Sequence, residues 1–315
     1  MNKNLKIIYY GTPEFAVEGL RVLLENKYNI VGVVTAPDKP AGRGQKIQES
    51  DVKKFAVANN LKVLQPTNLK SKEFLAELKE LNADLQIIVA FRMLPKAVWD
   101  MPKYGTFNLH ASLLPNYRGA APINWAIING ETETGVTSFF LNENIDTGNI
   151  ILQEKIEINE EDNIGTLYEK LMNLGGNVIL KTVKLIEEDK VVETKQEEIL
   201  NGKKPKLAPK IFRKELNIDW CKSSKEIYDY IRGLSPYPVA WTKLGGKMLK
   251  IYKAEYTLEN HNKNCGDIIS DKKTFMHICT KDGIIKLLEL QLEGKKKMQI
   301  DEFLRGANNL EFTIE

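Results

Sequence analysis

Residues 107–148 read FNLHASLLPNYRGAAPINWAIINGETETGVTSFFLNENIDTG, and the rest of the chain is organised around this stretch. Its opening residues predict a strand over 105–109. Side chains alternate between the two faces of a strand, so Asn108 and His110 leave the sheet on one face. Leu109 then points the other way, into the core. The pattern therefore places two polar groups side by side in an apolar frame.

A second apolar run, 135–141, predicts another strand, and Asp146 lies in the loop that follows it. Ligand sites in open α/β sheets lie outside the carboxyl ends of the strands. We therefore expect Asp146 to converge there with Asn108 and His110.

These three side chains suit acyl transfer to an amine. Attack on a carbonyl creates an oxyanion, to which the Asn108 amide and a protonated His110 ring can donate; losing one such donor typically costs about 2.7–4 kcal/mol of barrier. Asp146 can orient the imidazole and help to remove the proton of the amine. A structural histidine and an ordinary Asp-Thr-Gly turn are the alternative explanation of the same residues.

Three motifs resemble the 10-formyltetrahydrofolate-dependent formyltransferase family: NLHASLLP at 108–115, RGAAP at 118–122 and IDTG at 145–148. The resemblance implies a formyl transferase fold and activity, with 10-formyltetrahydrofolate as formyl donor and no metal. It implies that the matching catalytic residues are Asn108, His110 and Asp146. It also implies that the folate site is lined by Ser112, Leu113, Leu114 and Pro115.

The same resemblance extends the predicted folate site to the end of a buried strand over 85–90. Family members commonly read Ala-Tyr-Gly-x-Ile-Leu-Pro at this point. This chain reads AFRMLP at 90–95, one residue shorter and without the glycine. The further folate contacts implied are Phe91, Arg92, Met93, Leu94, Asn142 and Ile145.

Composition narrows the class of protein. The chain has 315 residues, 43% of them apolar, which fits one large or two ordinary domains. No run of about 18 apolar residues predicts a membrane span, and the first residues lack a signal peptide's apolar region. The three cysteines show no C-x-x-C spacing, which argues against zinc and a disulfide framework. We expect a cytoplasmic protein with no membrane partner, and a monomer.

The N-terminal part predicts an α/β fold. A buried strand over 5–10 is followed by Thr12-Pro13-Glu14, which read as the cap, first residue and first-turn acid of a helix. A second strand over 30–35 completes a β-α-β unit and hence a parallel sheet. Gly11 is not followed by the glycines of a dinucleotide-binding fingerprint, which argues against an NAD enzyme. We predict a doubly wound, mostly parallel Rossmann-like sheet.

The segment 36–46, APDKPAGRGQK, is expected to be an irregular loop because of its prolines and glycines. The resemblance implies that this loop enters the acceptor end of a transfer RNA. It assigns Arg43, with Lys46 beside it, to reading that RNA.

The C-terminal part predicts a second domain. We place the first domain at 1–190, a basic linker at 191–212, and a small OB-like β-barrel at 213–315, where short strands alternate with turns. From 203 onward, 22 Lys and Arg face 15 Asp and Glu, which suggests an anionic partner. The linker lysines assigned to transfer RNA are Lys203, Lys204, Lys206 and Lys210.

The leading hypothesis is transfer of a formyl group to the amino group of initiator methionyl-tRNA. Three alternatives stay open. In the first, the amine belongs to an amino-sugar nucleotide or glycinamide ribonucleotide. In the second, water replaces the amine and the chain is a formyl hydrolase. In the third, the chain binds transfer RNA with an inactive enzyme domain.

Overall fold

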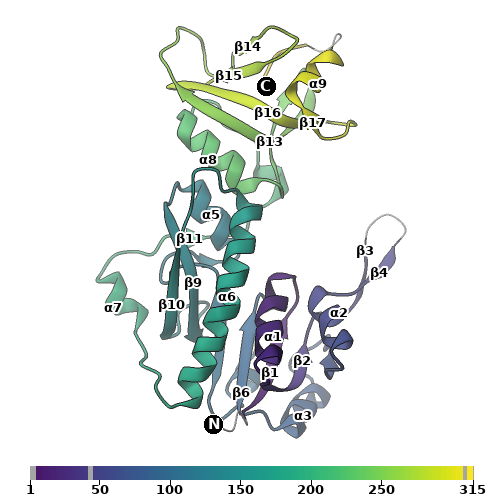
Figure 1. The fold of residues 1–315 in the computed structure, drawn as a ribbon, viewed down its shortest axis with the longest axis vertical. Helices are drawn as coiled ribbons and strands as arrows, with labels where there is room; N and C mark the ends of the chain where they lie inside the picture. The colour runs from purple at the N-terminus through teal and green to yellow at the C-terminus, as the bar shows by residue number, and fades with distance from the viewer. Residues whose placement is uncertain (1–4, 42–44, 308–310, 315) are drawn as a thin grey trace. The chain divides into compact units, whose positions relative to one another are not determined.

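The computed structural model describes residues 5–41, 45–307 and 311–314 (Figure 1). The chain divides into two compact units that interleave along the sequence. The first comprises 1–119, 135–156 and 168–207, and the second comprises 120–134, 157–167 and 208–315. The second unit thus includes two segments from the part of the chain predicted as the first domain. The domain boundaries at 190 and 212 stay predictions.

The first unit is built on a seven-stranded sheet with the order β10-β9-β7-β6-β1-β2-β5. β1 pairs in parallel with β2 and β6, and β6 with β7, whereas β9 runs antiparallel to β7. The mostly parallel Rossmann-like sheet predicted from the sequence is confirmed. The strands are β1 (Lys6–Gly11), β2 (Asn29–Val34), β5 (Val63–Leu64), β6 (Leu85–Val89), β7 (Thr106–His110), β9 (Glu133–Phe140) and β10 (Ile150–Glu157).

Helices cover both faces of this sheet. On one face, the Tyr9 hydroxyl donates to the carbonyl of Ala16 in α1 (Phe15–Glu25). On the other, Tyr10 belongs to an apolar cluster with residues of α3 (Lys72–Leu81) and α4 (Lys96–Trp99). Strands buried on both faces read as continuous apolar runs, as in IIYY of β1. The fold is therefore doubly wound.

The helices α2 (Asp51–Ala58) and α3 are each capped at the N-terminus by a serine side chain. The Ser50 hydroxyl accepts from Lys53 N at 3.0 Å, and Ser71 from Phe74 N at 3.2 Å. The predicted start of α1 is wrong: Glu14, not Thr12, occupies the cap position, and its side chain makes no capping hydrogen bond.

The prediction of an irregular loop over 36–46 is also wrong. β3 (Lys39–Ala41) and β4 (Lys46–Gln48) pair as an antiparallel hairpin that forms its own two-stranded sheet. Proline is tolerated at a strand edge, where no ladder N–H is needed. Arg43 lies outside the described residues, and the structure describes the backbone of Lys46 but not its side chain.

The predicted linker is not an extended spacer throughout. It contains α7 (Gln196–Leu200) and β11 (Leu207–Ala208). Tyr117 N donates to the Lys206 carbonyl at 2.6 Å, and Lys206 N donates to Asn116 Oδ1 at 3.0 Å. These bonds fix this part of the segment to the first unit.

The second unit contains an antiparallel sheet with the order β12-β13-β16-β15-β14, and β17 pairs with β16. The small antiparallel domain predicted for the C-terminal part is confirmed. Its strands are β12 (Ala240–Leu244), β13 (Lys247–Leu258), β14 (Ile268–Ser270), β15 (Met276–Cys279), β16 (Gly283–Leu292) and β17 (Met298–Gln299). Its helices include α5 (Pro122–Ile128), α8 (Ser224–Leu234) and α9 (Ile300–Arg305).

A buried ion pair anchors α8. Arg232 Nε donates to Asp229 Oδ1 at 2.7 Å, and its Nη1 donates to the Asp162 carbonyl at 2.8 Å. Both side chains are almost fully buried, and Asp229 also accepts from Lys225 Nζ at 2.7 Å, so two cations compensate its buried charge. None of the helices in the described ranges is long and apolar enough to cross a membrane.

Candidate active site

β7 presents Asn108 and His110 on one face of the first sheet. Leu109 points to the opposite face, where its side chain lies against Gly175 of α6 (Ile164–Glu187). His110 is buried, whereas Asn108 is half-buried. The predicted alternation along this strand is therefore confirmed.

The His110 ring is held by a single backbone contact. Its Nε2 lies 2.8 Å from the carbonyl oxygen of Tyr117. A carbonyl can only accept, so Nε2 carries the proton in this contact and Nδ1 is left to face the site. Tyr117 has a φ of +63°, the left-handed region, which few bulky residues adopt. The backbone turn at Tyr117 therefore decides which ring nitrogen is available for chemistry.

Asp146 meets His110 on that available nitrogen. Asp146 Oδ2 lies 3.9 Å from His110 Nδ1, and it accepts a hydrogen bond from Gly119 N at 3.0 Å. Its side chain is 13% exposed, so the pair is largely shielded from solvent. The structure thus brings together two predicted residues that are 36 positions apart in the chain.

The reason for this convergence differs from the predicted one. β9 is antiparallel to β7, with Phe140 opposite Phe107 and Thr137 opposite His110. The loop after β9 consequently starts at the amino end of β7, away from His110. Asp146 reaches the histidine because the loop folds back along the strand, not because two carboxyl ends meet.

Gln196 of α7 holds that returning loop in place. Its side chain is fully buried, and its Nε2 donates to the carbonyls of Asp146 at 3.0 Å and Gly148 at 2.8 Å. Its Oε1 accepts from Arg118 Nε and Nη2 at 3.0 and 2.7 Å. Sequence reasoning missed Gln196, because it falls in a segment predicted as a linker and no local pattern marks it. Arg118 was part of the RGAAP motif but was given no role in the site.

Gly148 completes the loop by allowing close approach. A Cβ atom built at this position would lie 1.6 Å from the Phe140 carbonyl oxygen. Only glycine fits at such a contact, which gives the Asp-Thr-Gly motif a steric reason. Asp146 itself has a φ of +54°, a region that aspartate tolerates better than most residues.

The predicted folate segment 112–115 forms a rigid turn beside His110. The Ser112 hydroxyl donates to the Asn116 carbonyl at 2.7 Å, and Thr137 Oγ1 donates to the Ser112 carbonyl at 2.6 Å. Ser112, Leu114 and Pro115 are buried, whereas Leu113 is partly exposed. Folate contacts from this segment stay a prediction.

The side chain of Arg92 anchors the segment 90–95, which follows β6. Its guanidinium donates to the carbonyls of Thr67, at 3.2 Å, and Pro66. Phe91 packs edge-on against Tyr10 with 5.7 Å between ring centroids. Leu94 is buried in the core, while Met93 is 75% exposed.

The two remaining predicted folate residues lie in the loop after β9. Asn142 Oδ1 accepts from Asn144 N at 3.0 Å and from Thr147 Oγ1 at 2.9 Å, so its side chain shapes the loop. Ile145 is 65% exposed, which leaves an apolar group available to a ligand beside Asp146.

The linker lysines lie at the surface. Lys203, Lys204, Lys206 and Lys210 are all exposed. Lys206 Nζ lies 5.9 Å from the centre of the Tyr117 ring, and Lys210 Nζ lies 5.5 Å from that of Phe212. Lys206 is therefore next to the residue whose carbonyl holds His110.

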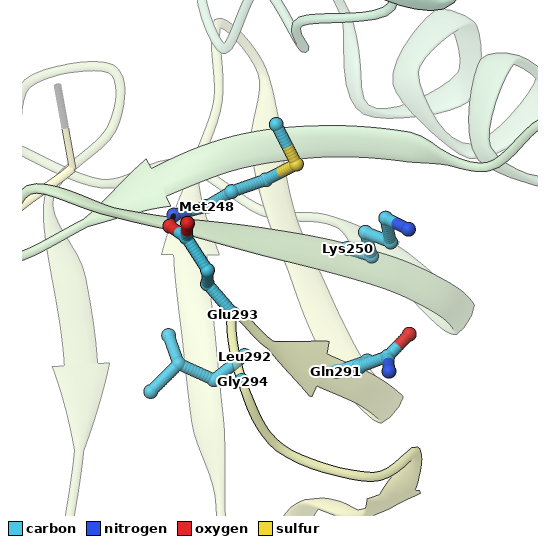
Figure 2. Close-up of a pocket in the computed structure, with 6 residues that line it drawn as sticks. All are labelled: Met248, Lys250, Gln291, Leu292, Glu293 and Gly294. Atoms are coloured by element: carbon cyan, nitrogen blue, oxygen red, sulfur yellow. Dashed lines mark hydrogen bonds between the residues drawn. The ribbon is translucent and has the colours of Figure 1, made fainter. Parts of the chain in front are cut away.

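A separate shallow pocket lies on the second unit and contains no predicted site residue (Figure 2). It is lined by Met248, Lys250, Gln291, Leu292, Glu293 and Gly294. Among the described side chains, no three His, Cys, Asp or Glu gather in a way that could hold a metal ion.

Comparison with protein families identifies the class. Residues 3–183 match the formyl transferase model, and residues 210–308 match the model of the formyl transferase C-terminal domain. The chain belongs to the formyl transferase family.

Individual proteins and solved structures give a more specific comparison than the family models. The chain is 57% identical over 308 residues to a methionyl-tRNA formyltransferase of Flavobacterium johnsoniae, covering 96% of each chain. It resembles the structure of an N-formyltransferase from Helicobacter canadensis in complex with folinic acid and dTDP-3-aminofucose, at 25% identity and a TM-score of 0.68. That match covers 90% of this chain and 99% of the other. HypX from Aquifex aeolicus shares the fold at 18% identity and a TM-score of 0.64; the match covers 98% of this chain and 49% of HypX.

The Gln196 contacts generate the first prediction. Gln196→Met keeps the side-chain volume but removes the donor to two backbone carbonyls and the acceptor for Arg118. We expect a loss of about 1–3 kcal/mol in unfolding free energy, because buried acceptors lose their partner. Urea unfolding measures it. Gln291→Met, at a partly exposed site where Nε2 donates to the Lys295 carbonyl, is the control and should cost less. Equal losses in both variants would contradict the role given to Gln196.

Proposed function

We propose that this chain transfers the formyl group of 10-formyltetrahydrofolate to the methionine amino group of initiator methionyl-tRNA. The observation that carries the proposal is the 57% identity to a methionyl-tRNA formyltransferase over 96% of both chains. The approach of Asp146 to His110 in the first unit supports it chemically. The solved relative bound to folinic acid supports a folate donor.

The proposed reaction forms one C–N bond and breaks another. The neutral amine attacks the formyl carbon and loses a proton, and the carbonyl oxygen becomes an oxyanion. The intermediate then collapses, the bond from carbon to N10 breaks, and tetrahydrofolate leaves after its N10 takes a proton. No net proton is consumed, so the site needs only to move one from amine to leaving group.

We assign each residue of the trio a role in this reaction. Asn108 and the Nδ1 of a protonated His110 donate to the oxyanion, in a site where donors act with little screening by water. Asp146 accepts the proton from the amine and returns it towards N10. Because Nε2 is committed to the Tyr117 carbonyl, Nδ1 serves both Asp146 and the substrate.

The residues assigned to the folate site include exposed apolar side chains, which suit contact with a bound pterin. Met93 and Ile145 are exposed apolar side chains at the ends of two segments predicted to line the site. Met93 and Phe91 follow β6, whereas Ile145 directly precedes Asp146. We propose that these residues contact the donor, with the 112–115 turn supporting His110 beneath it.

Loss of any member of the trio should stop transfer without unfolding the protein. In single-turnover assays, Asn108→Ala should lower the rate about 10²–10³-fold, the cost of one oxyanion donor. His110→Ala and Asp146→Ala should lower it at least as far, with unchanged circular dichroism. His261→Ala is a matched control, because its Nε2 also contacts a backbone carbonyl, that of Gly283 at 2.9 Å, but in the second unit. Near-normal rates in all three variants would reject the assignment.

The transfer RNA surface can be tested by charge removal. The double variant Lys206→Ala, Lys210→Ala should weaken binding of initiator methionyl-tRNA and reduce the slope of log K against log salt by about 2, because two phosphate contacts are lost. Affinity for the folate donor should not change. The double variant Lys72→Ala, Lys79→Ala removes the same charge from exposed positions of α3 and should bind normally. Identical salt slopes for both variants would argue against the linker surface.

A small amine is the second candidate substrate, favoured by the structural likeness to an enzyme bound to dTDP-3-aminofucose. Offering methionyl-tRNA, an amino-sugar nucleotide and glycinamide ribonucleotide with the same formyl donor separates the candidates. We expect transfer to methionyl-tRNA alone; preferred formylation of either small amine would overturn the proposal. Formate release without any amine would indicate a hydrolase. We further propose that the chain acts as a monomer in the cytoplasm.

A further inference from the structure

Two cysteines of the second unit lie in segments far apart in sequence. Cys221 precedes α8, and Cys265 precedes β14. Both side chains are exposed, whereas Cys279, the last residue of β15, is fully buried. Thiol chemistry requires access, so only the first two are open to reagents in the folded protein.

Backbone hydrogen bonds bring the two exposed cysteines together. Gly266 N donates to the Cys279 carbonyl at 2.8 Å, and Cys279 N donates to the Asp267 carbonyl at 2.9 Å. Two residues further on, Lys281 N donates to the Lys222 carbonyl at 3.2 Å. The segments that carry the two thiols are thus fastened to the same short stretch of chain.

These anchors keep the two cysteines in the same region of the second unit. Cys279 and Lys281 are at most about 7 Å apart, and Cys265 and Cys221 each adjoin a residue that is hydrogen-bonded to one of them. A disulfide joins residues whose Cα atoms are about 4.4–6.8 Å apart. The neighbouring Cys265 thiol raises the pKa of the Cys221 thiol, and partial desolvation and the nearby Asp219 add to this effect.

We infer that Cys221 and Cys265 form an oxidation site that closes to an intramolecular disulfide under a peroxide. The Cys265 thiolate attacks one peroxide oxygen, giving a sulfenic acid and, after protonation, water. The Cys221 sulfur then displaces the sulfenic oxygen as a second water, and the S–S bond forms. The two thiols lose two electrons and two protons, and hydrogen peroxide is reduced to two waters.

Formation of the disulfide would constrain the second unit, which carries both cysteines. The disulfide links the residues before α8 to the turn before β14, so that α8, β12 and β13 lie within the closed loop. Cross-linking a loop of this length restricts the unfolded chain and raises the temperature of unfolding. The inference is independent of the proposed function, because it rests on the second unit alone.

Hydrogen peroxide treatment of the full chain, followed by thiol counting under denaturing conditions, tests this site. We expect two of the three thiols to disappear and the mass to fall by two hydrogen atoms. Peptide mapping should join Cys221 to Cys265, and dithiothreitol should restore all three thiols. The unfolding temperature should rise by several degrees on oxidation and return on reduction.

Variants make the test specific. Cys221→Ser and Cys265→Ser should each abolish the linked peptide and the shift in unfolding temperature, whereas Cys279→Ala should keep both. Three unreacted thiols, disulfide-linked dimers, or oxygen adducts on single cysteines in the native chain would each overturn the inference.

Discussion

The hydrogen bond between His110 Nε2 and the Tyr117 carbonyl is the constraint on which the candidate site depends. It commits one ring nitrogen to the backbone, and so only Nδ1 can face Asp146 and a substrate. An imidazole that was free to rotate would not present the same nitrogen to both. The left-handed turn at Tyr117 and the contact of Lys206 with its ring surround this one carbonyl. The ring of His110 is thus oriented by backbone geometry, and the Asp146 carboxylate lies 3.9 Å from the remaining nitrogen.

The segment 191–212 contributes to the site as well as connecting two parts of the chain. Gln196 binds the carbonyls of the Asp146 loop and the Arg118 guanidinium, so one buried amide links the two sides of the site. Within the first unit, Lys206 of the same segment is exposed and lies over the Tyr117 ring. A polyanion bound along this segment would lie near the residues that set the position of Asp146. Binding of the proposed transfer RNA and alignment of the acid–base pair therefore share one piece of structure.

Local patterns predicted most of the secondary structure, because they depend on neighbours in the chain. Continuous apolar runs marked the central parallel strands. The prediction was wrong where proline and glycine content suggested an irregular loop for residues that pair as β3 and β4. It was also right for a wrong reason at Asp146, since the antiparallel direction of β9 cannot be read from its own residues.

By itself, the sequence determined the fold class, the strand that carries Asn108 and His110, and the side-chain types able to act on a carbonyl, because alternation and residue chemistry are local properties. Only the tertiary structure decided which nitrogen of His110 is available, how Asp146 reaches it, and that Gln196 supports both. It also placed Cys221 beside Cys265. Each of these depends on contacts whose geometry no local pattern encodes, across seven residues between His110 and Tyr117 and across fifty between Asp146 and Gln196.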